Sequence, residues 1–279
     1  FLCENFTQDR VISIMGIMQK NLVKKNKAYF LAGNQSIAFD QLEIFYRKKR
    51  GITKSNIYSI NEVKNLNKKL KYIINEDLKR ITLKRKSICG LKFNNPQIMG
   101  VLNVTPDSFS DGGLFLNKSK AYNQTKSMIN NGATIIDVGG ESTRPGAKTV
   151  NEKKELNRIK NIIIKIKKQF PKIPLSLDTR KSYVMKKGIE LGVNIINDVS
   201  GLNFDKKSFN IINLKKVPFV LHHMQGTPNT MQKNPNYDDA ILDIFDFFEE
   251  KINFCLKKNY KRELILLDPG IGFGKNLDH

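Results

Sequence analysis

Three kinds of feature are scarce in this 279-residue sequence, and each scarcity excludes a class of protein. The three cysteines, Cys3, Cys89 and Cys255, lie far apart, which excludes a disulfide framework and a cysteine metal site. Proline and glycine number 9 and 18, too few for collagen or a low-complexity chain. No apolar run approaches the ~18 residues of a membrane helix, and the stretch 11–18 lacks the cleavage site of a signal peptide. We therefore expect a globular protein of the cytoplasm, a reducing compartment.

Acidic residues are also few, with 26 Asp and Glu against 48 Lys and Arg, so the net charge is +22. Residues 1–97 hold 20 of the basic residues and only 7 of the acidic ones. Such asymmetry occurs in proteins that bind nucleic acid. However, Lys alternates with Asn and Ile along the whole chain, as AT-rich codons would produce, and no known nucleic-acid-binding module accompanies the basic stretch 61–79. The charge favours a solvated basic surface, with nucleic-acid binding as the alternative.

From residue 98 onward one pattern recurs: a short β-branched apolar run ends in a polar residue, and a turn and a helix-like segment follow. Such runs are typical of strands buried on both faces of a parallel sheet. The runs lie at 98–104, 134–138, 174–179, 194–198, 218–223 and 264–268, and the clearest helical segments at 151–170, 181–191 and 238–259. The alternation predicts an α/β protein.

The polar residues that close these runs distinguish between two α/β architectures. They are Asn103, Asp137, Asp178, Asn197, His222 and Asp268, spaced about 33 residues apart on average. A (β/α)8 TIM barrel gathers residues from all its strand ends at one rim, whereas a doubly wound sheet uses one or two strand ends and opens with a glycine-rich phosphate turn. We therefore predict a (β/α)8 TIM barrel at 98–279, with about six β/α units in the sequence and its C-terminal part missing.

Residues 1–97 show a different pattern, which we interpret as a basic N-terminal extension of α+β character. The apolar runs 27–32 and 36–46 predict two strands around a turn at Gly33 and Asn34. The stretch 61–79 predicts an amphipathic helix, and 81–88 a further strand. We expect the extension to pack on the bottom or side of the barrel, and the sequence assigns it no function.

The first two predicted strands open into segments with unusual chemistry. Residues 103–113 read Asn-Val-Thr-Pro-Asp-Ser-Phe-Ser-Asp-Gly-Gly, which is rich in oxygen ligands. In 137–146, Gly139 and Gly140 let the backbone approach a ligand, and Arg144 supplies a cation beside them. Asp and Ser at such places also cap helices, which is the alternative for any one of them.

These two segments closely resemble the dihydropteroate synthases, members of the pterin-binding enzymes. Further matches follow in family order at 177–179, 195–198, 223–228 and 267–275, so the resemblance covers about 98–279. It implies an enzyme, a transferase of folate biosynthesis, that condenses 6-hydroxymethyl-7,8-dihydropterin diphosphate with 4-aminobenzoate and releases diphosphate. It also implies Mg²⁺ as cofactor, small-molecule substrates, sulfonamide inhibition, a homodimer, and no nucleic-acid or membrane partner.

The resemblance also implies roles for individual residues. Those matched to the pterin pocket are Asp137, Asp178, Asn197, Met224 and Asp268, and Asn103 matches the diphosphate and metal position. Those matched to the aminobenzoate pocket are Phe109, Thr143, Arg144, Pro145 and Phe273, although the two Phe rings could equally anchor their loops. We expect Asn103, Asp137, Asp178, Asn197 and Asp268 to be the catalytic set. Carboxylates and a carboxamide suit the N–H and amino donors of a pterin edge. The family's dissociative C–O cleavage needs no protein nucleophile, and the sequence carries no nucleophile–base signature.

The chain departs from the family pattern at its C-terminal end. Family members carry a Lys at the end of strand seven and an Arg-x-His near strand eight, and the sequence as given stops at His279 before both. We therefore expect the chain as given to be impaired in turnover. One alternative function is that of a pterin-binding methyltransferase with the same barrel, which the segments at 103–113 and 137–146 disfavour. The other is a basic nucleic-acid-binding or assembly protein, which only the charge supports.

Two local patterns are discounted. The glycine-rich stretch 270–275 resembles a P-loop, but its spacing is wrong and Asn276 stands where Ser or Thr is needed. His222 and His223 are adjacent in a predicted strand, so their side chains point to opposite faces and cannot form a zinc pair.

Overall fold

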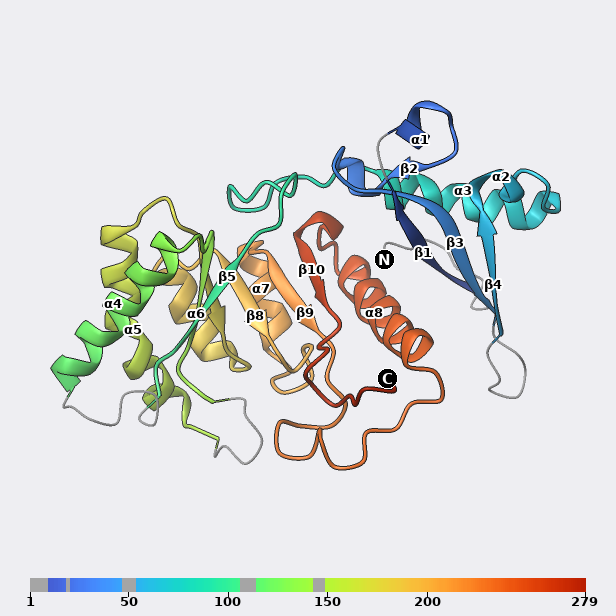
Figure 1. Cartoon of the computed structure of the whole chain (residues 1–279). Helices are drawn as coiled ribbons and strands as arrows, with labels where there is room; N and C mark the ends of the chain where they lie inside the picture. The colour runs from blue at the N-terminus through green and yellow to red at the C-terminus, as the bar shows by residue number, and fades with distance from the viewer. Residues whose placement is uncertain (1–9, 19–20, 47–53, 106–113, 143–148) are drawn as a thin grey trace. The chain divides into compact units, whose positions relative to one another are not determined.

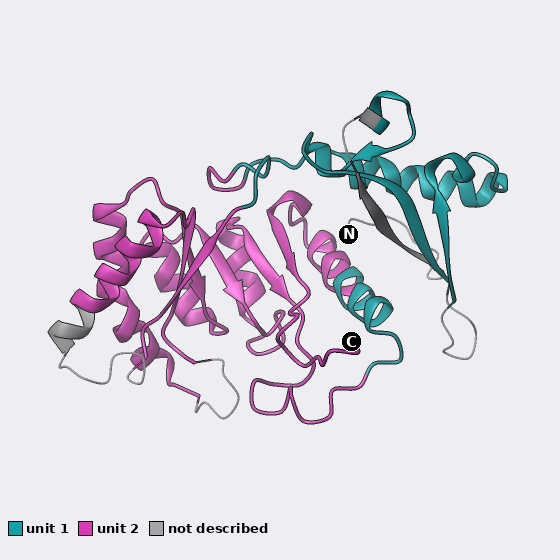
Figure 2. Cartoon of the chain, in the orientation of Figure 1, with its two compact units in different colours: residues 1–87, 92–96, 237–249 teal, residues 88–91, 97–236, 250–279 magenta. Residues whose placement is uncertain are grey.

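The computed structural model describes residues 10–18, 21–46, 54–105, 114–142 and 149–279. Its chain divides into two compact units, shown in different colours in Figure 2. The first unit comprises residues 1–87, 92–96 and 237–249, and the second comprises 88–91, 97–236 and 250–279. The division at residues 97 and 98 expected from the sequence stays a prediction, as does the packing of the extension on the barrel.

The second unit contains a six-stranded parallel sheet (Figure 1). Its strands are β5 (Met99–Asn103), β6 (Ile135–Gly139), β7 (Leu175–Asp178), β8 (Ile195–Asp198), β9 (Phe219–His222) and β10 (Ile265–Asp268). All six predicted strands are confirmed. They lie side by side in chain order from β5 to β10, as in a (β/α)8 barrel, whereas a doubly wound sheet reverses its order at a switch point. Among the described strands, β5 and β10 form the two edges of this sheet.

Helices connect these strands. They are α4 (Leu114–Asn130), α5 (Glu152–Gln169), α6 (Ser182–Glu190), α7 (Ser208–Lys215) and α8 (Ala240–Lys257), with a short 3-10 turn, η3 (Arg262–Leu264), before β10. The sequence of α5 explains its limits: Asn151 caps its start by accepting a hydrogen bond from the Lys153 N–H at 2.9 Å, and Lys167 and Lys168 complement the dipole in its last turn. No helix in the described ranges is long and apolar enough to cross a membrane.

The first unit is built on a small antiparallel sheet. Its strands are β1 (Arg10–Met18), β2 (Tyr29–Phe30), β3 (Ala38–Tyr46) and β4 (Lys54–Ser59), and β3 pairs with the other three. Three helical segments accompany them: α1 (Asn21–Lys24), α2 (Ile60–Val63) and α3 (Lys68–Thr82). The strand predicted at 36–46 is confirmed as β3, and the apolar stretch 11–18 lies in β1. The strand predicted at 27–32 is reduced to β2, because a 3-10 turn, η1 (Leu31–Gly33), follows it.

Two further predictions for this unit were wrong in part or in whole. The single helix expected at 61–79 is two helices, because Asn67 starts α3 afresh by accepting a hydrogen bond from the Leu70 N–H at 2.9 Å. The strand expected at 81–88 does not form, since α3 continues to Thr82 and residues 83–87 have no regular structure. Strand β4, Lys-Ser-Asn-Ile-Tyr-Ser, was missed because it shows no clear apolar alternation.

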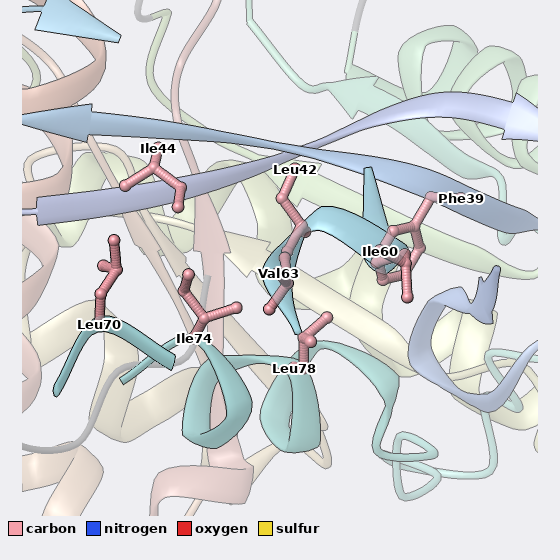
Figure 3. Packing of buried hydrophobic residues seen from close by; sticks show 8 residues of the cluster. All are labelled: Phe39, Leu42, Ile44, Ile60, Val63, Leu70, Ile74 and Leu78. Carbon is pink, nitrogen blue, oxygen red and sulfur yellow. The ribbon is translucent and has the colours of Figure 1, made fainter. Parts of the chain in front are cut away.

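The core of the first unit lies between β3 and the helices α2 and α3 (Figure 3). Its buried side chains are Phe39, Leu42, Ile44, Ile60, Val63, Leu70, Ile74 and Leu78. The four-residue spacing of Leu70, Ile74 and Leu78 places all three on one face of α3. Phe45 follows Ile44 in β3 and packs instead with Leu242 and Phe245 of α8. Because neighbouring strand residues point to opposite faces, β3 is covered on both sides.

A buried carboxylate in this core predicts a pH-dependent stability. Asp77 is 4% exposed, with Oδ1 3.2 Å from the Arg80 guanidinium, and burial raises its pKa to about 6. The unfolded chain loses this proton near pH 3.9, so Asp77 lowers stability progressively as pH rises from about 4 to 6. Asp77→Asn cannot ionise, and we expect its unfolding free energy at pH 7.5 to exceed that of the wild type by about 3 kcal/mol.

Urea denaturation at pH 4 and pH 7.5, with hydrogen exchange to follow α3, measures this effect. The two proteins should differ at pH 7.5 and converge at pH 4. Glu76→Gln changes the neighbouring, partly exposed carboxylate of the same helix and is the control, which should show no such pH-dependent gain. Equal stability of Asp77→Asn and wild type at both pH values would contradict the assignment.

Candidate active site

The register of the parallel sheet places polar side chains in two layers at the carboxyl ends of the strands. Asn103, Gly139, Asp178 and Asn197 are partners in one row across β5, β6, β7 and β8. Asp137 and Ser176 are partners two residues earlier on β6 and β7. Since residues two apart on a strand point to the same face, both rows face the same side of the sheet. The sheet therefore brings together four predicted site residues from four strands.

Asp137 and Asn197 are joined by a hydrogen bond, with Asn197 Nδ2 donating to Asp137 Oδ2 at 3.0 Å. Asp137 is 3% exposed. Asp137 Oδ1 and Asn197 Oδ1 are both buried and accept no hydrogen bond of normal geometry from any described residue. Buried acceptors left in this state are costly. The site thus presents two acceptor atoms that a ligand with N–H donors would satisfy.

Asp178 stands beside this pair in a strongly acidic environment. Burial raises its pKa well above the usual range, and the neighbouring charges of Asp137, Glu155 and Asp198 raise it further. Burial also raises the pKa of Asp137, against the polar side chains of Ser176 and Asn197, which lower it. When two such carboxyl groups interact, their protons are lost in steps that belong to the pair. The ligand-free pair therefore retains a proton to a higher pH than isolated Asp side chains do.

Asn103 is the last residue of β5 and pairs with Gly139 on the side of β6 that is opposite Asp178. A methyl group placed on Gly139 would lie 3.2 Å from Asn103 Oδ1 and 3.4 Å from Asp178 Oδ2. The carboxamide and the carboxylate thus flank the same space. Among the described residues, no group of three or more His, Cys, Asp or Glu side chains could hold a metal ion. A single carboxamide oxygen fits a cation such as Mg²⁺ only where ligand oxygens and water complete the shell.

The ends of β9 and β10 form a second cluster. The Asp268 carboxylate accepts a hydrogen bond from the Gly270 N–H at 2.8 Å, and its Oδ2 lies 3.9 Å from His222 Nε2. The Phe273 ring packs edge-on against the buried His222, with ring centroids 4.6 Å apart. Met224 follows β9 and is partly buried. Lys275 Nζ contacts the Gly270 and Phe273 carbonyl oxygens at 2.9 and 3.0 Å, which shapes the turn after β10. Burial lowers the pKa of Lys275 to about 8.

A buried charge network that the sequence analysis missed joins the segments after β6 and β7 to α5. Lys181 Nζ donates to Glu155 Oε2 at 2.5 Å and also to Glu141, which accepts from Arg180 as well. Thr179 donates to Glu155 at 2.5 Å. Burial raises the pKa of Glu155, while hydrogen bonds from Lys181 and Arg180 outweigh burial at Glu141 and lower its pKa. A signal was present: Glu155 stands four residues before Ile159 on the apolar stripe of α5, where a carboxylate requires a buried partner.

Four predicted aminobenzoate residues, Phe109, Thr143, Arg144 and Pro145, lie outside the described residues. Three of them belong to residues 143–148. The described residues on either side of this segment are joined by a hydrogen bond, which Glu141 Oε2 accepts from the Val150 N–H at 3.1 Å. The predicted roles of all site residues stay predictions. What the structure provides is the juxtaposition of Asn103, Asp137, Asp178 and Asn197.

Comparisons with known proteins identify the family of the chain. A family model described as pterin binding enzyme matches residues 99–279. The dihydropteroate synthase of Escherichia coli K12 is 44% identical over 190 residues, which are 68% of this chain and 67% of that protein. The dihydropteroate synthase of Clostridium beijerinckii is 46% identical over 181 residues, 65% of this chain and 64% of that protein. The chain therefore spans about two thirds of the length of these relatives.

Solved structures give the same result. The Yersinia pestis dihydropteroate synthase, solved with a sulfonamide drug complex, is 43% identical with a TM-score of 0.63, covering 68% of each chain. The Xanthomonas albilineans dihydropteroate synthase in complex with 7,8-dihydropteroate is 33% identical with a TM-score of 0.58, covering 67% of this chain and 64% of that one.

Proposed function

The chain belongs to the dihydropteroate synthases of the pterin-binding enzyme family, and on that premise we propose that its strand ends bind 6-hydroxymethyl-7,8-dihydropterin diphosphate for condensation with 4-aminobenzoate. The observation that carries this proposal is the pair of buried acceptors, Asp137 Oδ1 and Asn197 Oδ1, beside the Asp178 carboxylate. The edge of a pterin carries an amino group and a ring N–H, which are the donors that these atoms lack. Charge-assisted bonds from such donors to carboxylates are directional and strong.

The chain's own residues would then orient the substrate rather than attack it. Asp137, Asp178 and Asn197 would hold the pterin ring, with Asp268 and Met224 at its border. Ring donors bonded to carboxylates also disperse the positive charge that develops on the pterin as the diphosphate leaves. Asn103, at the end of β5, would face the diphosphate, and Phe273 would contribute to the aminobenzoate side together with Phe109, Thr143, Arg144 and Pro145.

We further propose Mg²⁺ as the cofactor, with Asn103 Oδ1 as its protein ligand and diphosphate oxygens and water as the others. When bound, the ion would neutralise the leaving diphosphate. A homodimeric state and a cytoplasmic location are also part of the proposal, and sedimentation velocity tests the first of these.

Isothermal titration of the chain with 6-hydroxymethylpterin, with and without diphosphate and Mg²⁺, tests the proposed binding site. We expect saturable binding with one pterin per chain. Formation of 7,8-dihydropteroate from the two substrates, inhibited by a sulfonamide, tests the reaction. Absence of pterin binding by a folded chain would overturn the proposal.

The raised pKa values predict that pterin binding is coupled to proton release. The free Asp137–Asp178 pair retains a proton to a higher pH than isolated Asp side chains do, whereas an ionised pair is the better acceptor for two ring donors. We therefore expect pterin affinity to increase as pH rises, until the pair is ionised in the free protein as well. Titration in two buffers of different ionisation enthalpy measures the protons released per ligand bound. Asp178→Asn should abolish this release, and identical proton counts for wild type and variant would contradict the coupling.

A further inference from the structure

Gly139 is the last residue of β6, inside a ladder where glycine is a poor choice. Although Gly139 ends its strand, strands pair with it on both sides. Glycine inside a sheet weakens the strand and often marks a bulge, a sharp bend or a site where a ligand or another backbone comes close. The register runs unbroken from Asn103 through Gly139 to Asp178, so there is no bulge. Gly139 is also absent from the residues with positive φ, so its backbone conformation is open to other residues.

Packing of the protein against itself does not require this glycine either. The nearest atoms to a methyl group on Gly139 would be Asn103 Oδ1 at 3.2 Å, Asp178 Oδ2 at 3.4 Å and Asp178 Cβ at 3.5 Å. The first contact is tight but involves a side-chain end, and the other two are ordinary van der Waals distances. The Gly139 carbonyl oxygen already accepts a hydrogen bond from the Val104 N–H at 2.7 Å. What the glycine contributes is therefore space between two polar side chains.

The adjacent glycine has the opposite role. A methyl group on Gly140 would lie 2.9 Å from the Glu155 carbonyl oxygen and 3.0 Å from Ile159 Cγ2, both in α5. Gly140 therefore permits close packing of α5 on β6. The two glycines look equivalent in the sequence, but only Gly139 faces the layer of Asn103, Asp178 and Asn197.

We propose that Gly139 is a substrate-binding residue of the site: the absence of a side chain leaves a flat wall against which the pterin ring lies between Asn103 and Asp178. This inference rests on the proposed function. A planar heterocycle can place its face or edge against the Cα of Gly139 while its donors reach the acceptors on the neighbouring strands. A methyl group at this position would displace the ring from those acceptors, and the loss of one hydrogen bond to a charged group weakens binding by about 10- to 100-fold.

The test compares Gly139→Ala with Gly140→Ala in the same chain, by calorimetry with 6-hydroxymethylpterin and by thermal unfolding. We expect Gly139→Ala to unfold at the temperature of the wild type and to bind the pterin about 10- to 100-fold more weakly. Gly140→Ala should unfold at a lower temperature, because α5 must shift.

Two results would overturn the inference. The first is wild-type pterin affinity in Gly139→Ala. The second is a fall in its unfolding temperature equal to that of Gly140→Ala, since the glycine would then serve packing alone. If the wild type itself binds no pterin, the proposed function fails first. That failure is therefore distinct from the failure of the role of Gly139.

Discussion

Asp178→Asn is expected to weaken pterin binding by about 2–4 kcal/mol, the scale of losing a charge-assisted hydrogen bond while leaving a ligand donor unpaired. The substitution keeps the size of the side chain, so the row from Asn103 to Asn197 should stay intact. It also removes a carboxyl group whose ionisation is opposed by burial and by the neighbours Asp137, Glu155 and Asp198 in the free protein. The folded chain should therefore lose affinity without losing stability.

Calorimetry with 6-hydroxymethylpterin measures this loss, and Asp268→Asn on β10 provides a second arm with an expected loss in the same range. Asp205→Asn is the matched control. The Asp205 carboxylate accepts hydrogen bonds from the Ser182 and Lys207 N–H groups, both at 2.9 Å, and neither donor belongs to the two layers. Its pterin affinity should equal that of the wild type. Unchanged affinity in both Asp178→Asn and Asp268→Asn would remove these residues from the site.

Lys181→Met should have the largest effect on stability. Its ammonium lies between Glu141 and Glu155, and the Glu155 side chain is fully buried. Breaking a buried ion pair by removing one partner leaves an uncompensated charge and costs about 3–5 kcal/mol. The pKa of Glu155, already raised by burial, should rise further, so the loss should be greater at pH 8 than at pH 5.

Urea denaturation followed by circular dichroism at these two pH values measures the loss. Lys187→Met removes one partner of the exposed pair between Lys187 and Glu190 and is the control, for which no measurable change is expected. The double variant Lys181→Met with Glu155→Gln should recover part of the loss, because no charge is then stranded at residue 155. Equal stabilities of Lys181→Met and Lys187→Met would show that the network contributes nothing to the fold.

The parallel sheet could be predicted from the sequence because each strand is a local signal. The β-branched runs are buried on both faces, and a polar residue closes each of them at a spacing that suits β/α units. The N-terminal unit was predicted less well. Strand β4 is mostly polar and pairs only because β3 lies beside it, and the break between α2 and α3 depends on the single cap at Asn67.

The site itself divides in the same way. Residue types and their positions at predicted strand ends indicated four site residues, since both features can be read from the sequence. These residues are Asn103, Asp137, Asp178 and Asn197. Only the register of the strands showed that these residues form two layers. Only the side-chain contacts showed that two buried acceptor atoms lack a donor. Hydrogen-bond satisfaction depends on partners 60 residues apart, such as Asn197 and Asp137, which no local pattern encodes.

The sequence by itself therefore determined the fold class, the family and the identity of the polar strand ends, because periodicity and motifs are local properties. The tertiary structure alone decided which of two adjacent glycines faces the site, which carboxylates keep a proton, and how Lys181 neutralises Glu141 and Glu155. These properties arise from burial and from the distances between atoms of different strands and helices. The free energy of a buried charge is set by what surrounds it in space.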